Sequence, residues 1–142
     1  SGVPQTFFNG TGKGSGNAAY ATLKSRIDAQ LTLTPKVSIQ ASRSTNGQTS
    51  IITGSIKNIS SNDLSNLVIN GMTLKSRGSF GYAVTNIFEN EKISVSSLAA
   101  GETKNFTMTL TDINWDGQGY DGVIFVQSTS GVKTIYQSLY IN

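Results

Sequence analysis

The segment DINWDGQGYDG, residues 112–122, concentrates oxygen ligands of the kind that hard cations prefer. Its polar side chains at the first, third and fifth positions of a calcium-type loop are Asp112, Asn114 and Asp116. The twelfth position of such a loop supplies a bidentate carboxylate, but here it is Val123, and Asp121 falls two residues short. We therefore predict no metal site and interpret the segment as a loop between strands. Calcium held by Asp112, Asn114, Asp116 and Asp121 is the alternative.

The residue types that most often perform catalysis are missing from the sequence. It has no Cys and no His, which excludes thiolate and imidazole chemistry. The carboxylates that could supply an acid–base pair are Glu89, Glu91, Asp112, Asp116 and Asp121. Two of them would need to lie ~5 Å or ~6.5–9.5 Å apart across a cleft to hydrolyse a glycosidic bond. We predict that the chain is not an enzyme and needs no cofactor, with a hydrolase as the alternative.

The glycine-rich segment GTGKGSG, residues 10–16, superficially resembles a phosphate-binding loop. Such a loop requires a glycine five residues before a Gly-Lys-Ser/Thr sequence that opens a helix. Gly12 and Lys13 are followed by Gly14, and the earlier glycine is absent. We therefore predict a flexible connector between a strand and a helix.

Aromatic side chains form the candidate ligand surface, and they are Trp115, Tyr120, Tyr136 and Tyr140. On a regular strand Tyr136 and Tyr140 would share one face, opposite Ile135 and Leu139. If Ile135 belongs to the core, both tyrosines face outward, which suits ligand binding or a dimer contact. The alternative is that the tyrosines pack beneath a neighbouring loop with their hydroxyl groups in water.

The elements that position these residues are mostly strands. Tyr20, Leu23, Ile27 and Leu31 follow helical spacing, and Pro35 ends this helix. After Pro35, alternating apolar residues and turn signals such as Asn46-Gly47 predict seven or eight antiparallel strands. The predicted fold is an immunoglobulin-like β-sandwich. Its expected core residues are Ile39, Ile56, Val84, Phe106, Leu110, Phe125 and Ile135.

Composition and charge narrow the class of partner. The 142 residues carry a net charge of +3 and include 19 Ser, 16 Thr and 12 Asn, a polar surface that favours an extracytoplasmic setting. The Lys and Arg residues are scattered rather than clustered with aromatic residues, so we predict no nucleic-acid partner. No apolar run approaches the ~20 residues of a membrane span.

The opening residues carry a family resemblance. Val3-Pro4, Phe7-Phe8 and Asn9-Gly10 resemble the strand that follows the active-site region of a thioredoxin-like fold. Together with the helix and residues 97–110 and 122–141, this layout resembles the Omp28-like family of bacterial extracytoplasmic proteins. The resemblance implies a domain boundary: residues 1–34 form the last strand, glycine-rich loop and helix of a thioredoxin-like region, and residues 35–142 form the sandwich.

The resemblance also implies roles for the first residues. Val3 and Pro4 would be a remnant of a peptide-binding edge without the cysteine pair that such an edge serves. The alternative is an ordinary N-terminal strand with proline at its start. We predict a non-catalytic extracytoplasmic module that contacts proteins or peptides, with a carbohydrate-binding or adhesive sandwich as the alternative. An unpaired apolar strand edge invites association, so we expect a homo-oligomer built through residues 3–8 and the helix.

Overall fold

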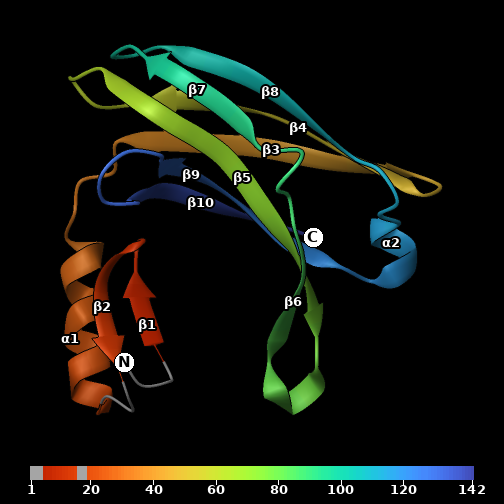
Figure 1. Cartoon of the computed structure of the whole chain (residues 1–142), viewed down its shortest axis with the longest axis horizontal. Helices are drawn as coiled ribbons and strands as arrows, with labels where there is room; N and C mark the ends of the chain where they lie inside the picture. Colours follow the sequence, from red (N-terminus) through yellow and green to blue (C-terminus); the bar gives the residue numbers. More distant parts are fainter. Residues whose placement is uncertain (1–4, 16–18) are drawn as a thin grey trace.

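The computed structural model describes residues 5–15 and 19–142. The chain begins with a small β-hairpin, β1 (Gln5–Phe8) and β2 (Thr11–Ser15), which is followed by helix α1 (Tyr20–Leu31). Two antiparallel sheets follow (Figure 1). The predicted glycine-rich connector was wrong at residues 11–15, which pair with β1 as a strand. Residues 11–15 contain no apolar side chain, so no hydrophobic alternation marks this strand, and only its backbone pairing with β1 defines it.

The three-stranded sheet has the order β3-β4-β8. Its strands are β3 (Val37–Asn46), β4 (Thr49–Asn58) and β8 (Thr103–Leu110). The predicted Asn46-Gly47 hairpin turn is confirmed, with Gly47 at φ +59°. That positive φ is the conformation for which glycine is favoured in short hairpins.

The larger sheet has the order β10-β9-β5-β6, with β7 also paired to β5. Its strands are β5 (Leu64–Ser76), β6 (Tyr82–Ile87), β7 (Ile93–Leu98), β9 (Asp121–Ser128) and β10 (Ile135–Ile141). Short helical segments η1 (Gly78–Phe80) and α2 (Trp115–Gln118) join β5 to β6 and β8 to β9.

Strand β5 runs without a break through Asn70-Gly71. A Cβ at Gly71 would lie 2.7 Å from the carbonyl oxygen of Val123 and 2.8 Å from the ring of Phe88. Glycine is therefore present because β9 and Phe88 approach the backbone closely, not because the chain turns there.

The hydrophobic core lies between the two sheets. Four of the expected core residues are buried: Ile39, Ile56, Phe106 and Leu110. The expectation was wrong for Val84, which is 53% exposed, and for Phe125, which is only half-buried. Ile124 and Val126 are fully buried on the opposite side of β9, so strand alternation turns Phe125 away from the core. Ile135 is also half-buried.

The N-terminal hairpin meets the sandwich at its turn, which approaches β10 (Figure 1). The Ile135 amide donates to the Asn9 carbonyl oxygen at 2.8 Å. A Cβ on Gly10 would lie 1.8 Å from the Lys133 carbonyl oxygen. A larger residue at Gly10 would therefore separate the hairpin from β10.

Helix α1 confirms the predicted helical stripe, yet its apolar side chains are largely uncovered. No residue within Tyr20–Leu31 is buried. Tyr20 is 78% exposed and Leu31 is 79% exposed. Among the described residues, no helix has the length and apolarity that a membrane crossing requires.

Candidate functional site

The acidic segment before β9 uses its oxygen atoms to build local structure. Asn114 is the N-cap of α2, and its Oδ1 accepts from the Gly117 amide at 2.8 Å. Asp116 forms an ion pair with Arg43, with 2.7 Å between Oδ1 and Nη1. Asp121 belongs to β9, and Asp112 adopts a positive φ of +59°. Within the described part of the chain, no three or more His, Cys, Asp or Glu residues gather as a group that could hold a metal ion.

Trp115 lies in the core rather than on a ligand surface. Its side chain is 1% exposed, and the Arg43 guanidinium carbon lies 5.1 Å from the ring centroid. A Cβ on Gly122 would approach the indole to 2.3 Å, so glycine leaves the space that the ring occupies. This corrects the expectation that Trp115 contacts a ligand, because the short helix α2 folds the ring inward.

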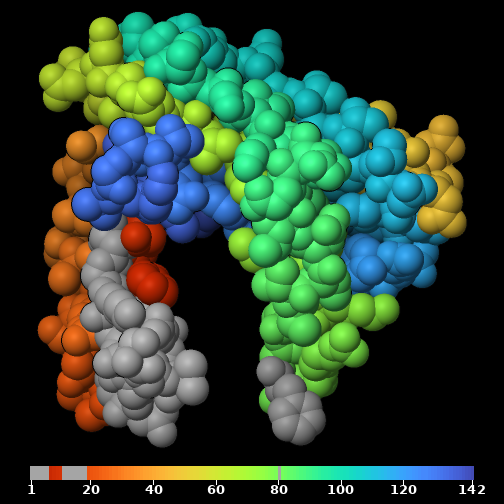
Figure 2. All heavy atoms as spheres, viewed as in Figure 1, coloured from red at the N-terminus to blue at the C-terminus, as the bar shows by residue number. Residues whose placement is uncertain are grey.

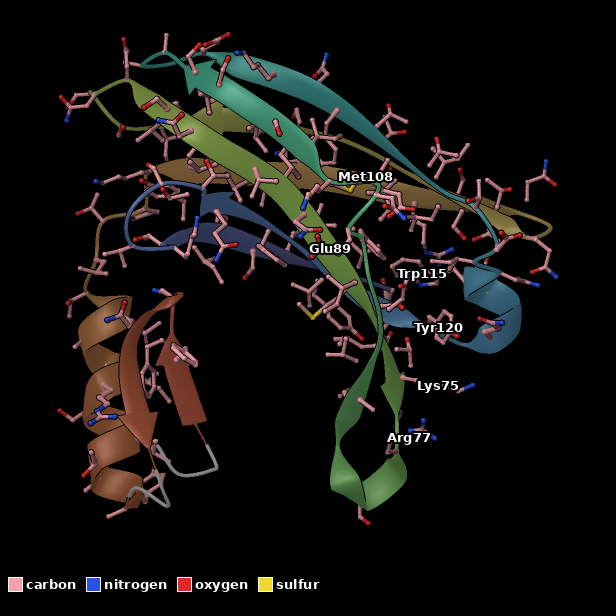
Figure 3. All side chains as sticks on the ribbon, viewed as in Figure 1. Lys75, Arg77, Glu89, Met108, Trp115 and Tyr120 are labelled. Carbon is pink, nitrogen blue, oxygen red and sulfur yellow. The ribbon has the colours of Figure 1, made fainter. Side chains whose placement is uncertain are left out.

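The three tyrosines of the predicted ligand surface have different surroundings. Tyr120 is half-buried, and the Lys75 ammonium lies 5.7 Å from its ring centroid; both residues are labelled in Figure 3. Tyr136 is also partly buried and packs against the core, whereas Tyr140 is 52% exposed. A register shift between Ile135 and Gln137 interrupts the alternation that would have placed Tyr136 and Tyr140 on one face.

The outer sheet face is an apolar surface on the side of the larger sheet that points away from the core. Its most exposed members are Tyr82, Val84, Ile87 and Tyr140, which are 58%, 53%, 49% and 52% exposed. Strand pairing places Tyr140 opposite Val123, Val123 opposite Met72, and Met72 opposite Ile87. Directly opposed residues share a face, so these four form one row across β10, β9, β5 and β6.

A second row extends this face. It runs from Asp121 through Leu74 to Val84, because each of these pairs is directly opposed in the sheet. The register shift between Thr73 and Leu74 keeps Val84 and Ile87 on the same side of β6 despite their odd spacing. Figure 2 shows an open space beneath the sandwich between the N-terminal unit and the β5–β6 hairpin.

A polar group interrupts the apolar face at Tyr140. The Asp121 carboxylate forms a hydrogen bond with the Tyr140 side chain, and this bond is the main reason that the pKa of Tyr140 lies well above its ordinary value. Partial desolvation and a hydrogen bond with Tyr82 act in the same direction. The Tyr140 hydroxyl is neutral at physiological pH, as it would be at the ordinary tyrosine pKa of about 10.

Three of the five carboxylates suggested for hydrolysis have structural partners. Glu89 pairs with Lys92 at 2.8 Å, Asp116 pairs with Arg43, and Asp121 bonds to Tyr140. Val3 and Pro4 lie outside the described residues.

The outer sheet face was not predicted from the sequence, because its apolar residues are of the same types as those of a hydrophobic core. Val84 on β6 was expected in the core, yet both Val84 and Tyr82 are exposed. The usable signal was on β9, where the unbroken apolar run 123–126 predicts a strand with apolar side chains on both faces.

Comparison with known proteins identifies the fold alone. No protein-family model and no curated protein matches the sequence. A domain of the outer membrane lipoprotein Omp28 from Porphyromonas gingivalis is similar, with a TM-score of 0.55 and 16% identity over 76% of this chain and 88% of that one. HBP35 of Porphyromonas gingivalis is similar, with a TM-score of 0.68 and 13% identity over 87% of this chain and 46% of HBP35. The predicted antiparallel β-sandwich is confirmed, and its fold is similar to that of the Omp28 domain.

Proposed function

We propose that this chain is a non-catalytic, extracytoplasmic module that binds protein or peptide partners and is related to Omp28-type proteins. The fold similarity to a domain of an outer membrane lipoprotein supports this proposal. The polar, Ser-, Thr- and Asn-rich composition agrees with an extracytoplasmic setting. In this proposal residues 1–34 are the end of a thioredoxin-like region and residues 35–142 are the binding sandwich.

The outer sheet face is the observation that carries the proposal. Tyr82, Val84, Ile87 and Tyr140 are each about half exposed, and half-buried apolar side chains fill the space between them. Contiguous exposed apolar surface on a folded protein marks a binding site more often than chance. The aromatic rings supply large contact area at low entropic cost, as in many protein interfaces.

The polar group within this face adds selectivity. Tyr140 and Asp121 offer a hydroxyl and a carboxylate among apolar neighbours. A partner that buries this face must satisfy both groups, because an unpaired buried polar group costs free energy. The preferred partner therefore carries apolar side chains together with a hydrogen-bond donor.

Self-association through residues 3–8 and α1 is a second part of the proposal. Phe7 is 58% exposed, and Tyr20, Ile27 and Leu31 of the α1 stripe are 78%, 48% and 79% exposed. A second copy that pairs with the same segment would cover both and would close on itself by two-fold symmetry.

A displayed library of random peptides tests the binding function. We expect the chain to enrich peptides that share an apolar motif, and the Ile87→Lys variant to lose at least about tenfold in affinity for them, because a buried lysine must be desolvated. Ile51→Lys is the matched control, since Ile51 is exposed on the other sheet. If no peptide is enriched, or if both variants lose affinity equally, the proposal is wrong.

A further inference from the structure

We propose that the outer edge of β10 binds an extended peptide carrying a carboxylate group, by adding that peptide to the sheet as a further strand. This inference rests on the proposed function, because it names a class of partner for the same module. It concerns a different surface from the outer sheet face, namely the groove between β10 and the segment that follows α1.

In the part of the chain that the structure describes, the sheet order β10-β9-β5-β6 leaves the outer edge of β10 without a neighbouring strand. Two backbone amides near the start of β10 donate hydrogen bonds to groups that do not belong to a neighbouring strand. The Ile135 amide donates to the Asn9 carbonyl oxygen at 2.8 Å, and the Ser138 amide donates to Oε1 of Gln137 at 3.0 Å. The first bond shows that this edge accepts a main-chain carbonyl from another segment.

The Gln137 side chain acts as a substitute for a neighbouring strand. Its amide oxygen covers the amide of the next residue on the exposed surface. An exposed local bond of this kind contributes little free energy, since water competes for both groups. The carbonyl oxygen of an incoming strand can therefore displace it and continue the pattern that Asn9 begins.

A groove of about 520 Å³ runs beside this edge. This volume lies within the ~300–1,000 Å³ typical of ligand sites. Leu33, Pro35, Ile135 and Tyr136 supply the apolar part of its lining. The groove can therefore receive an apolar side chain of a peptide whose backbone pairs with β10.

The charge of the groove selects the peptide. Among the described residues that line it, Lys36 is the only charged one, and the others are amide, hydroxyl or apolar residues. An acidic side chain or a C-terminal carboxylate near Lys36 would complement it. An extended chain is favoured over a small anion, because the strand edge needs a partner with backbone donors and acceptors.

Strand β3 limits the length of the added strand. It lies beside β10 but belongs to the other sheet and forms no ladder with β10 in the described chain. Because Asn9 already accepts from the Ile135 amide, the pairing site is residues 136–138, which line the groove. A strand this short binds weakly, so the probe should be used at millimolar concentration.

The probe is the acetylated peptide Val-Thr-Val-Thr-Val with a free C-terminal carboxylate, titrated into the isotope-labelled full chain and followed by amide chemical shifts. We expect shifts at residues 134–138 and at Lys36. The same peptide with a C-terminal amide should bind more weakly, and an N-methylated version that cannot donate backbone hydrogen bonds should not bind.

Variants of the edge separate pairing from general stability. Gln137→Ala should tighten binding about 2- to 10-fold, since it frees the Ser138 amide for the peptide. Ser138→Pro should abolish binding because it removes the amide, and an edge strand tolerates proline there. Ser138→Ala keeps the amide and should bind like the unaltered chain. Lys36→Gln should weaken binding of the free acid but not of the C-terminal amide.

Three results would overturn the inference. They are no binding by the free acid, weaker binding by Gln137→Ala, or shifts confined to the outer sheet face around Ile87. The last result would leave the proposed function intact, because the peptide would then bind the surface on which that function rests. The two surfaces would also be separated if Ile87→Lys lost binding of the library-selected peptides while the shifts that the free-acid probe causes at residues 134–138 stayed unchanged.

Discussion

At the scale of single residues, Tyr140 gives a spectroscopic test of the outer sheet face. Its pKa is raised, first by the hydrogen bond with Asp121, so folding favours the neutral phenol. The resulting stabilisation is present below the ordinary tyrosine pKa of about 10 and is lost as pH rises through the higher folded pKa. We expect ultraviolet titration to show a late phenolate step that disappears in Tyr140→Phe and moves to lower pH in Asp121→Asn. An unchanged step in Asp121→Asn would contradict this geometry.

Neighbouring residues on β9 test which face points into the core. Ile124 is fully buried, whereas Phe125 is half-buried on the outer side. Ile124→Ala should therefore lower the free energy of unfolding by ~2–5 kcal/mol. Phe125→Ala should cost less, about 1–2 kcal/mol, despite removing more atoms, since that ring is partly exposed on the outer face. Urea denaturation would measure both, and a larger loss for Phe125→Ala would reverse the assignment of faces.

At the scale of elements, Arg43 on β3 holds α2 against the sandwich. Its guanidinium contacts the Trp115 ring, donates to Thr45 at 2.8 Å, and pairs with Asp116. The Arg43 side chain is 13% exposed, so Arg43→Ala should lower the free energy of unfolding by about 2 kcal/mol through lost packing and cation–π contact. Asp116 is 60% exposed, and Asp116→Ala should cost under about 1 kcal/mol. If thermal or urea unfolding shows equal losses of unfolding free energy for Arg43→Ala and Asp116→Ala, then the ion pair, and not the contact between guanidinium and indole, holds α2.

The elements that were predictable from the sequence are those with a local chemical signal. The Asn46-Gly47 turn needs a positive φ, and the α1 stripe follows helical spacing, so both are visible without a structure. Strand β2 was not predictable, because its glycines offer no alternation and its pairing depends on β1.

The candidate site was harder to predict than the fold, because register shifts determine which side chains of β6 and β10 point outward. The shift between Ile135 and Gln137 separates Tyr136 from Tyr140, and that between Thr73 and Leu74 aligns Val84 with Ile87. A single extra residue in a strand reverses which side chains face outward. Neither shift has a turn residue or proline to mark it. Tyr140 could therefore be placed from sequence, but its neighbours could not.

At the scale of the whole molecule, the N-terminal unit predicts association. A chain of 15.1 kDa should show about twice that mass in light scattering at micromolar concentration, since Phe7 on β1 and most of the α1 stripe are exposed. Leu31→Glu should shift the mass toward the monomer, whereas Ser25→Glu, on the opposite side of α1, should not. Deleting residues 1–16 should weaken association and leave the sandwich folded. A monomeric full chain would contradict the proposal.

The central claim is that the outer sheet face binds a partner, and amide chemical-shift mapping with a library-selected peptide tests it most directly. The expected shifts cluster on the outward residues of β5, β6, β9 and β10 around Met72, Ile87 and Tyr140, and they vanish in Ile87→Lys but persist in Ile51→Lys. Shifts confined to the outer face of the β3-β4-β8 sheet, around Thr53 and Thr107, would contradict the account.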